Sequence, residues 1–177
     1  MEEFELTYLV KILPVDIKVA SHQDIIDIYI PASVEHPTFR IRKNGNKREI
    51  TKKEPIHGQD SSHQLETTIP LSEDEFQELN NLAGKRIYKT RYFYNENGVN
   101  YEIDVFRGGL EGLVLVDVEF NSLAEKGNFV PPSWCLVEVT QEKFIAGGML
   151  CGKRYDDIRD NLEGFGYKKL RISPQDD

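Results

Sequence analysis

The sequence predicts a mainly β fold in which antiparallel strands form either a sandwich or a closed barrel. Two Asn-Gly pairs, at positions 44–45 and 97–98, lie between alternating segments and indicate tight hairpins. Few segments have a helical pattern. Nine short segments alternate apolar and polar residues with the period of two that strands require: 3–12, 24–30, 38–43, 47–53, 63–70, 86–94, 99–106, 112–121 and 135–139.

The clearest helix signal covers residues 73–83. Ser72 and Glu75 have the spacing of a capping box, in which each side chain accepts a hydrogen bond from the other residue's backbone N–H. A second helix is expected to start near Thr140, and a third is expected over residues 153–162. With so few helices, the strands must form most of the core.

Composition limits the class of protein. The 177 residues suit one domain, and 39% hydrophobic with 29% charged residues is ordinary for a globular chain. The net charge of −8 argues against a nucleic-acid or anionic-membrane partner. Cys135 and Cys151 lack metal-type spacing, and the first residues do not resemble a signal peptide, so a cytoplasmic protein is expected. Only the tail at 173–177 looks dispensable, and we expect it to be disordered.

Several strands carry pairs of like charges on their polar face. In "VLVDVEF" (114–120), Asp117 and Glu119 project from one face, about 6.5–7 Å apart, opposite three valines and Phe120. The same alternation gives two further acidic pairs, Glu3 with Glu5 and Glu102 with Asp104, and two basic pairs, Arg40 with Arg42 and Lys89 with Arg91. On two other strands the polar face carries either both signs of charge, at Glu49 and Lys53, or the single charge of Glu66.

A sheet with one face in water would explain any one of these strands. For the whole set this explanation is weaker, because like charges on neighbouring strands repel unless something charged lies between them. Guanidinium groups match the oxygens of a phosphate chain. Carboxylates are the ligands that hard divalent cations prefer. On one concave face, the two kinds of pair would form a site for a metal–polyphosphate complex.

The same segments resemble the motifs of the CYTH superfamily, also called triphosphate tunnel metalloenzymes. The opening "EFELTYLV" is similar to the ExExK signature, and the likeness continues through "KTRYFY", "YEIDVF", "GLVLVDVEF" and "EVT". It extends from Glu3 to Leu150. The resemblance implies a single CYTH-like domain over residues 1–177, built as a closed eight-stranded antiparallel barrel with helices packed outside.

The resemblance also implies a function, namely metal-dependent hydrolysis of inorganic triphosphate or a similar substrate with Mg²⁺ or Mn²⁺. By position, the metal-binding residues would be Glu3, Glu5, Asp117 and Glu119. Residues holding phosphate would be Arg40, Arg42, Lys53, Lys89, Arg91 and Lys143. Carboxylates that complete the site, hold basic side chains or orient water would be Glu66, Glu102 and Asp104. On this assignment we expect Arg42→Ala to weaken substrate binding and leave the fold intact.

One departure from the family pattern leaves alternatives open. Thr7 stands where ExExK has its lysine, and Lys11 or Lys153 are the candidates to replace it. A non-catalytic polyphosphate- or nucleotide-binding protein is therefore an alternative to an enzyme. Thiamine-triphosphatase and adenylyl cyclase activities are alternatives within the family. The expected partner is a small polyphosphate, and the chain is expected to be a monomer or homodimer.

Overall fold

The computed structural model describes residues 2–58 and 60–172, so the tail at 173–177 lies outside the described residues. Each predicted strand is confirmed, with ends shifted by three residues at most. The strands form one antiparallel sheet: β1 (Glu2–Val10), β2 (Ser21–Ile30), β3 (Phe39–Asn44), β4 (Lys47–Pro55), β5 (His63–Pro70), β6 (Lys85–Glu96), β7 (Val99–Phe106), β8 (Val114–Phe120) and β9 (Cys135–Glu138).

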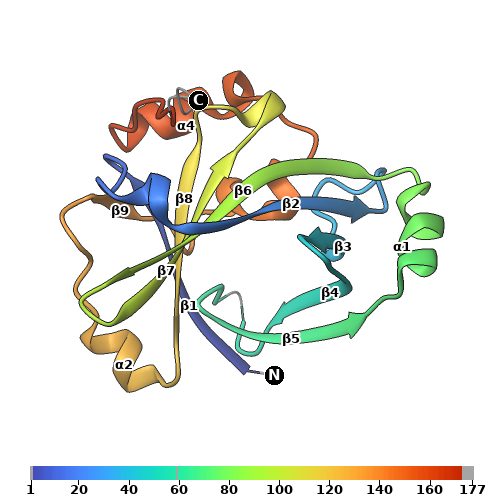
Figure 1. Ribbon diagram of the computed structural model, residues 1–177, viewed down its shortest axis with the longest axis horizontal. Coiled ribbons are helices and arrows are strands. Elements are labelled where there is room, and N and C mark those ends of the chain that lie inside the picture. Colours follow the sequence, from blue (N-terminus) through green and yellow to red (C-terminus); the bar gives the residue numbers. More distant parts are fainter. Residues whose placement is uncertain (1, 59, 173–177) are drawn as a thin grey trace.

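The sheet closes into a barrel. Its strand order is β5-β4-β3-β2-β6-β7-β8-β1-β9, and β1 pairs with β5 as well, which joins eight strands in a ring (Figure 1). The closing seam is short, because β1 and β5 pair only from Glu2↔Leu65 to Phe4↔His63. β9 pairs with the far end of β1 and lies outside the ring.

Both predicted hairpins are present. The β6–β7 turn places Asn97 and Gly98 at positive φ, 54° and 81°, as a tight two-residue turn requires. The β3–β4 turn is one residue later than the Asn-Gly pair suggests, because Asn44 still pairs with Lys47 in the ladder. Gly45 takes the positive φ of that turn, 55°.

Two of the predicted helices are confirmed with shifted ends, α1 (Glu73–Asn80) and α4 (Tyr155–Gly164). Ser72 caps α1 as expected: its hydroxyl accepts from the Glu75 N–H at 3.3 Å. The expected helix near Thr140 is wrong. That segment forms a 3₁₀ turn and one short helix, η3 (Lys143–Ile145) and α3 (Gly147–Leu150), which are separated by Ala146 at ψ 136°.

Three short elements were not predicted. They are η1 (Ile17–Val19), η2 (Gly108–Leu110) and α2 (Leu123–Asn128). α2 contains Gly127, which weakens any helical pattern, although Ser122 caps its first turn. Among the described residues, no helix is both long and apolar enough to cross a membrane.

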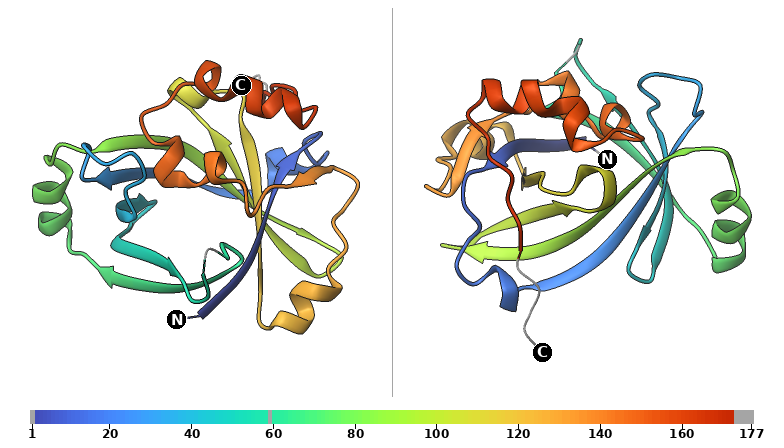
Figure 2. Two further views of the ribbon diagram at one scale, coloured as in Figure 1. Left: turned by 180° about the vertical axis from the view of Figure 1, so that it is seen from behind. Right: turned by 90° about the horizontal axis from the view of Figure 1, so that it is seen from above.

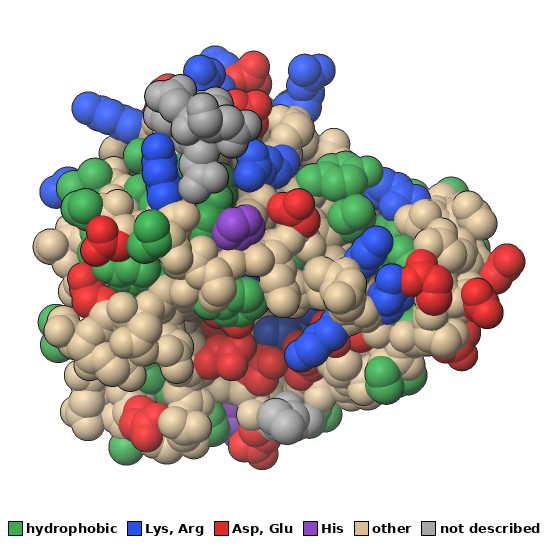
Figure 3. Space-filling model, viewed as in Figure 1, with side chains coloured by type: hydrophobic (Ala, Val, Ile, Leu, Met, Phe, Trp, Pro, Cys, Tyr) green, Lys and Arg blue, Asp and Glu red, His purple; other side chains and the backbone are tan. Residues whose placement is uncertain are grey.

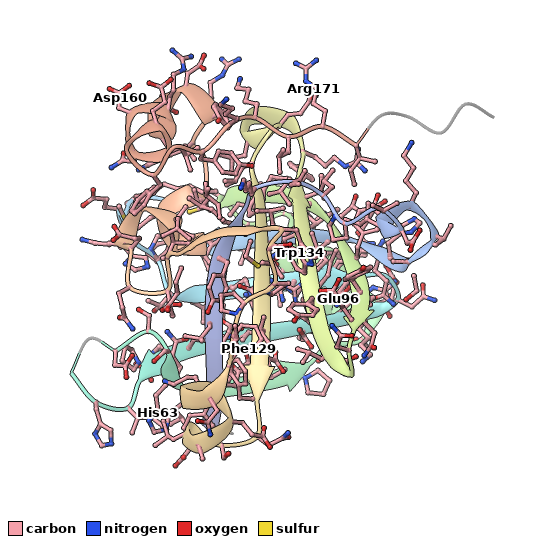
Figure 4. All side chains as sticks on the ribbon, turned by 90° about the vertical axis from the view of Figure 1, so that its left-hand side faces the viewer. His63, Glu96, Phe129, Trp134, Asp160 and Arg171 are labelled. Carbon is pink, nitrogen blue, oxygen red and sulfur yellow. The ribbon has the colours of Figure 1, made fainter. Side chains whose placement is uncertain are left out.

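The outer face of β1, β7 and β8 holds one apolar core. Tyr8, Ile103 and Val116 are buried there beneath Trp134 and Phe129, from the segment that leads into β9. Trp134 donates from its indole Nε1 to Glu96 Oε2 at 3.0 Å (Figure 4). The apolar side chains of these strands therefore face outward, and the polar side chains that alternate with them face the lumen.

A second apolar core closes part of one barrel end. The lumen-facing positions there are apolar rather than charged, as with Leu9, Phe106 and Leu115. η3 and α3 cross this end, and their buried residues Ile145 and Leu150 pack on the same cluster (Figure 2, left view). This packed apolar layer therefore borders the charged section of the lumen and fixes the strands at that end of the barrel.

The contact between α3 and the loop that follows β2 yields a stability prediction. A Cβ at Gly148 would lie 2.3 Å from the Pro37 carbonyl oxygen and 2.5 Å from His36 Cδ2. Gly148→Ala should lower the melting temperature by several degrees, since overpacking costs about 1–3 kcal/mol. Gly127→Ala is the matched control, because nothing lies within 4 Å of its added Cβ. Equal melting temperatures for the two variants would contradict this packing.

Candidate active site

The barrel lumen contains a cavity of about 630 Å³. Acidic and basic side chains lie close together in the hollow at the centre of the molecule (Figure 3). Every site residue expected from the sequence lines this cavity: Glu3, Glu5, Arg40, Arg42, Lys53, Glu66, Lys89, Arg91, Glu102, Asp104, Asp117, Glu119 and Lys143. The shared location is therefore as expected, while the role of each residue stays a prediction.

Charges of one sign gather on one side of the lumen. β1, β8 and β7 are neighbours and form an acidic wall, in which Glu5 pairs with Glu119 and Glu102 with Asp117 across the ladders. β3, β4 and β6 supply the basic side chains. The acidic wall meets the basic residues of β6 where Arg91 pairs with Asp104.

Asp104 is the centre of a buried ion cluster. Arg91 donates from Nε to Oδ1 and from Nη2 to Oδ2, both at 2.7 Å, and the Lys89 ammonium also contacts Oδ2. Burial alone would raise the pKa of Asp104, but Arg91 and Lys89 outweigh it and hold that pKa well below its usual range. Asp104 therefore stays charged and fixes two basic side chains in the lumen.

A second buried pair was not expected from the sequence. Asp27 on β2 is 1% exposed and accepts two bonds from Arg42, from Nε at 2.6 Å and from Nη2 at 2.8 Å. Arg40 Nε is 3.9 Å from the same carboxylate. Asp27 was missed because Ile26 and Ile28 flank it in a strand that reads as apolar, and no acidic partner two positions away marks it.

Lys53 contacts the acidic wall from the basic side. Its ammonium is 2.6 Å from Glu3, 3.6 Å from Glu66 and 3.7 Å from Glu5. Burial would lower the pKa of Lys53, but the carboxylates of Glu5 and Glu3 raise it, so the ammonium stays charged. Neither Lys11 nor Lys153 lines the cavity, and Lys53 is the ammonium that meets the β1 carboxylates.

Two carboxylates of the acidic wall resist ionisation. Burial, together with Glu102, Glu5 and Glu3, raises the pKa of Glu119 to about 7. Burial and the neighbouring Glu5 raise the pKa of Asp117 to about 6. The Thr7 hydroxyl donates to Asp117 Oδ1 at 2.7 Å. Thr7 thus takes part in the wall without the charge that a lysine would supply.

The acidic wall suits a divalent cation in its chemistry. Carboxylate oxygens are hard ligands, and the raised pKa values of Asp117 and Glu119 reflect burial and, after it, repulsion by neighbouring acids that a cation would relieve. Within residues 2–58 and 60–172, no three acidic, His or Cys side chains converge as a ready-made metal cluster. Glu3 and Glu5 are directed at Lys53 instead. The donor set fits a cation once these side chains turn from Lys53.

A closed antiparallel barrel whose lumen sets an acidic wall against basic side chains defines a class of polyanion-binding tunnel proteins. Comparison with known proteins specifies the class further. An inorganic triphosphatase of Nitrosomonas europaea is 34% identical over 117 residues, which are 65% of this chain and 75% of that protein. The chain therefore belongs to the CYTH superfamily of triphosphate tunnel proteins. No family model matches the sequence.

Solved structures agree with this assignment. The crystal structure of an inorganic triphosphatase superposes with a TM-score of 0.61 at 28% identity, over 84% of this chain and 93% of that one. A candidate adenylate cyclase from Bacillus halodurans superposes with a TM-score of 0.50 over 98% and 94% of the two chains. At 12% identity, the second match shows the fold alone.

The Asp27–Arg42 pair changes the expectation for Arg42→Ala. Removal of Arg42 leaves Asp27 buried without its bidentate partner, so the free energy of unfolding should fall by about 3–5 kcal/mol. Arg40→Ala should cost much less, because Arg40 is 3.9 Å from that carboxylate. Urea denaturation of both variants measures the difference. Equal losses would show that Asp27 does not depend on Arg42.

The pKa values of Asp117 and Glu119 predict a pH dependence of stability. Both carboxylates bind protons more tightly in the folded chain than in the unfolded chain, where their pKa values are about 4. The stability they add at low pH is therefore lost as the pH rises through about 6 and about 7.

In chelator, the melting temperature should fall between pH 5 and pH 8, and Glu119→Gln should flatten this slope. His36 also lines the cavity, and burial lowers its pKa. Its contribution to stability therefore rises with pH in the acidic part of this range, opposite to that of the two carboxylates. The variant His36→Gln separates that contribution. An unchanged slope in Glu119→Gln would contradict the raised pKa.

Proposed function

We propose that this chain hydrolyses inorganic triphosphate in the barrel lumen with the help of Mg²⁺ or Mn²⁺. The observation that carries the proposal is the acidic wall facing basic side chains in one cavity of about 630 Å³. A relative with 34% identity is named an inorganic triphosphatase. A linear polyanion with bound cations is the kind of ligand that satisfies both kinds of charge at once.

The basic residues of β3, β4 and β6 would hold the phosphate chain. Arg40 is the most available of them, since its Nε is 3.9 Å from Asp27 and has no hydrogen-bond partner among the described residues. Lys89 and Arg91 share Asp104 but face the same cavity. Arg42 and Lys53 complete this set, and the exposed Lys143 stands at the cavity rim. Each charge-assisted hydrogen bond to phosphate would contribute about 1.5–3 kcal/mol.

The acidic wall would hold the cation through Glu3, Glu5, Asp117 and Glu119. Bound there, a divalent cation would supply charge neutralisation on the phosphoryl oxygens. The cation would displace the Lys53 ammonium from Glu3 and Glu5, and the ammonium could then turn toward phosphate. Binding of the cation would thus prepare both the acidic wall and the basic residue Lys53 for the substrate.

The remaining carboxylates have different surroundings and different proposed roles. Asp104 is 2% exposed and bound to Arg91 and Lys89, so it holds basic side chains in position. Glu102 and Glu66 have side chains that are 28% and 22% exposed and open on the cavity, where they would orient water. Water would attack the terminal phosphorus in line, break its bond to the bridging oxygen and release phosphate and pyrophosphate.

Phosphate release from triphosphate tests the proposal. The parent chain should release phosphate in Mg²⁺ or Mn²⁺ and not in chelator. Glu119→Gln should lower the rate by about a hundredfold or more, since one of the carboxylates that would hold the cation is lost. Glu111→Gln, at an exposed turn outside the lumen, is the matched control and should keep the parent rate.

Other outcomes identify the alternatives. Tight triphosphate binding without turnover in either metal would indicate a polyphosphate- or nucleotide-binding protein and would contradict the proposed hydrolysis. Faster release from thiamine triphosphate, or cyclic AMP formed from ATP, would indicate the other activities of the family. The expected cytoplasmic location, the lack of nucleic-acid or membrane partners, and the monomeric or homodimeric state stay predictions.

A further inference from the structure

The two arginines of β3 are adjacent in the lumen but differ in what they offer a phosphate. Arg42 places Nε and Nη2 on the two oxygens of Asp27, at 2.6 and 2.8 Å, in the parallel arrangement that a guanidinium also uses to bind phosphate. Its preferred binding edge is therefore occupied by a resident carboxylate. Three donors are left for a ligand, the two N–H groups of Nη1 and the second N–H of Nη2.

Arg40 has the opposite arrangement. Its Nε is 3.9 Å from Asp27, beyond hydrogen-bond distance. This Nε is buried and has no hydrogen-bond partner among the described residues. A buried, unsatisfied donor in a cavity-lining guanidinium is a group that a ligand oxygen would satisfy.

Asp27 keeps its charge in this environment. Burial would raise its pKa, but Arg42 and Arg40 lower it far below the usual range for a carboxylic acid. Arg42 and Asp27 then form a neutral pair whose field in the lumen decays faster than that of a single charge. The pair lies next to Arg40 across the β2–β3 ladder, where Asp27 pairs with Arg42 and Tyr29 with Arg40.

We propose that Asp27 is a positioning residue that cancels the charge of Arg42 and occupies its binding edge, so that Arg40 rather than Arg42 sets the affinity for triphosphate. The proposal rests on the proposed function for its ligand. Its consequence is a lumen that holds triphosphate without holding the pyrophosphate product too tightly. Asp27 thus moderates affinity rather than taking part in the chemical step.

Equilibrium binding tests this role without relying on turnover. Calorimetry would measure triphosphate binding in chelator and pyrophosphate binding in Mg²⁺. Asp27→Asn removes the charge at nearly constant shape and should tighten both ligands by about tenfold or more. Asp24→Asn is the matched control on the same strand, where Asp24 accepts from Thr90 on the barrel exterior, and it should leave both affinities unchanged.

A double variant keeps the test valid if Asp27→Asn does not fold. Asp27→Asn with Arg42→Gln replaces the ion pair by two neutral amides and preserves the net charge of the lumen. If Asp27 cancels Arg42, this variant binds triphosphate within about fivefold of the parent. A larger loss would show that Arg42 acts as a full phosphate ligand and would overturn the proposal.

A lower melting temperature with unchanged or weaker binding in the folded Asp27→Asn variant would overturn it as well, because Asp27 would then be purely structural. Failure of the proposed hydrolysis gives a different result, namely tight binding without phosphate release. The two failures are therefore distinguishable.

Discussion

Charges enclosed in a barrel must be compensated within the barrel, and this constraint organises the lumen. Asp104 and Asp27 each neutralise buried cations, and both stay ionised because guanidinium groups outweigh the cost of burial. The acidic wall has no such compensation at Glu119, whose pKa rises instead. Most of the lumenal carboxylates thus have a basic partner, and Glu119 marks the place where further positive charge would be stabilised.

Closure of the barrel is what brings these groups together. β1 carries Glu3 and Glu5 between β5 and β8, which are far from it in the sequence. Lys53 reaches those carboxylates only because β1 and β5 meet at a three-residue seam. An open sheet would separate the same residues by its full width. The β6–β7 hairpin alone holds both signs of charge, at Arg91 and Asp104, but only closure of the barrel brings Glu3 and Glu5 to Lys53.

The period-two pattern predicted the strands and most of the lumen because side-chain direction in a strand follows from parity alone. Asp27 escaped it because a single acid between isoleucines gives no repeat, and only the neighbouring strand reveals its partner Arg42. The sequence pattern after Thr140 predicted a helix wrongly, because the local pattern does not show the tertiary contacts that this segment makes. Gly147, for example, has no room for a Cβ, which would lie 2.0 Å from Tyr29 Oη.

The position of β1 at the seam also has a consequence for how the chain folds. β1 is synthesised before its partners β8 (Val114–Phe120) and β9 (Cys135–Glu138). Both partners follow it by more than a hundred residues. Until then, Leu6, Tyr8 and Val10 lack the core that buries them. Contacts of such long range make folding slow and leave strand edges exposed during synthesis. During that interval the unpaired edges of β1 are open to pairing with other chains.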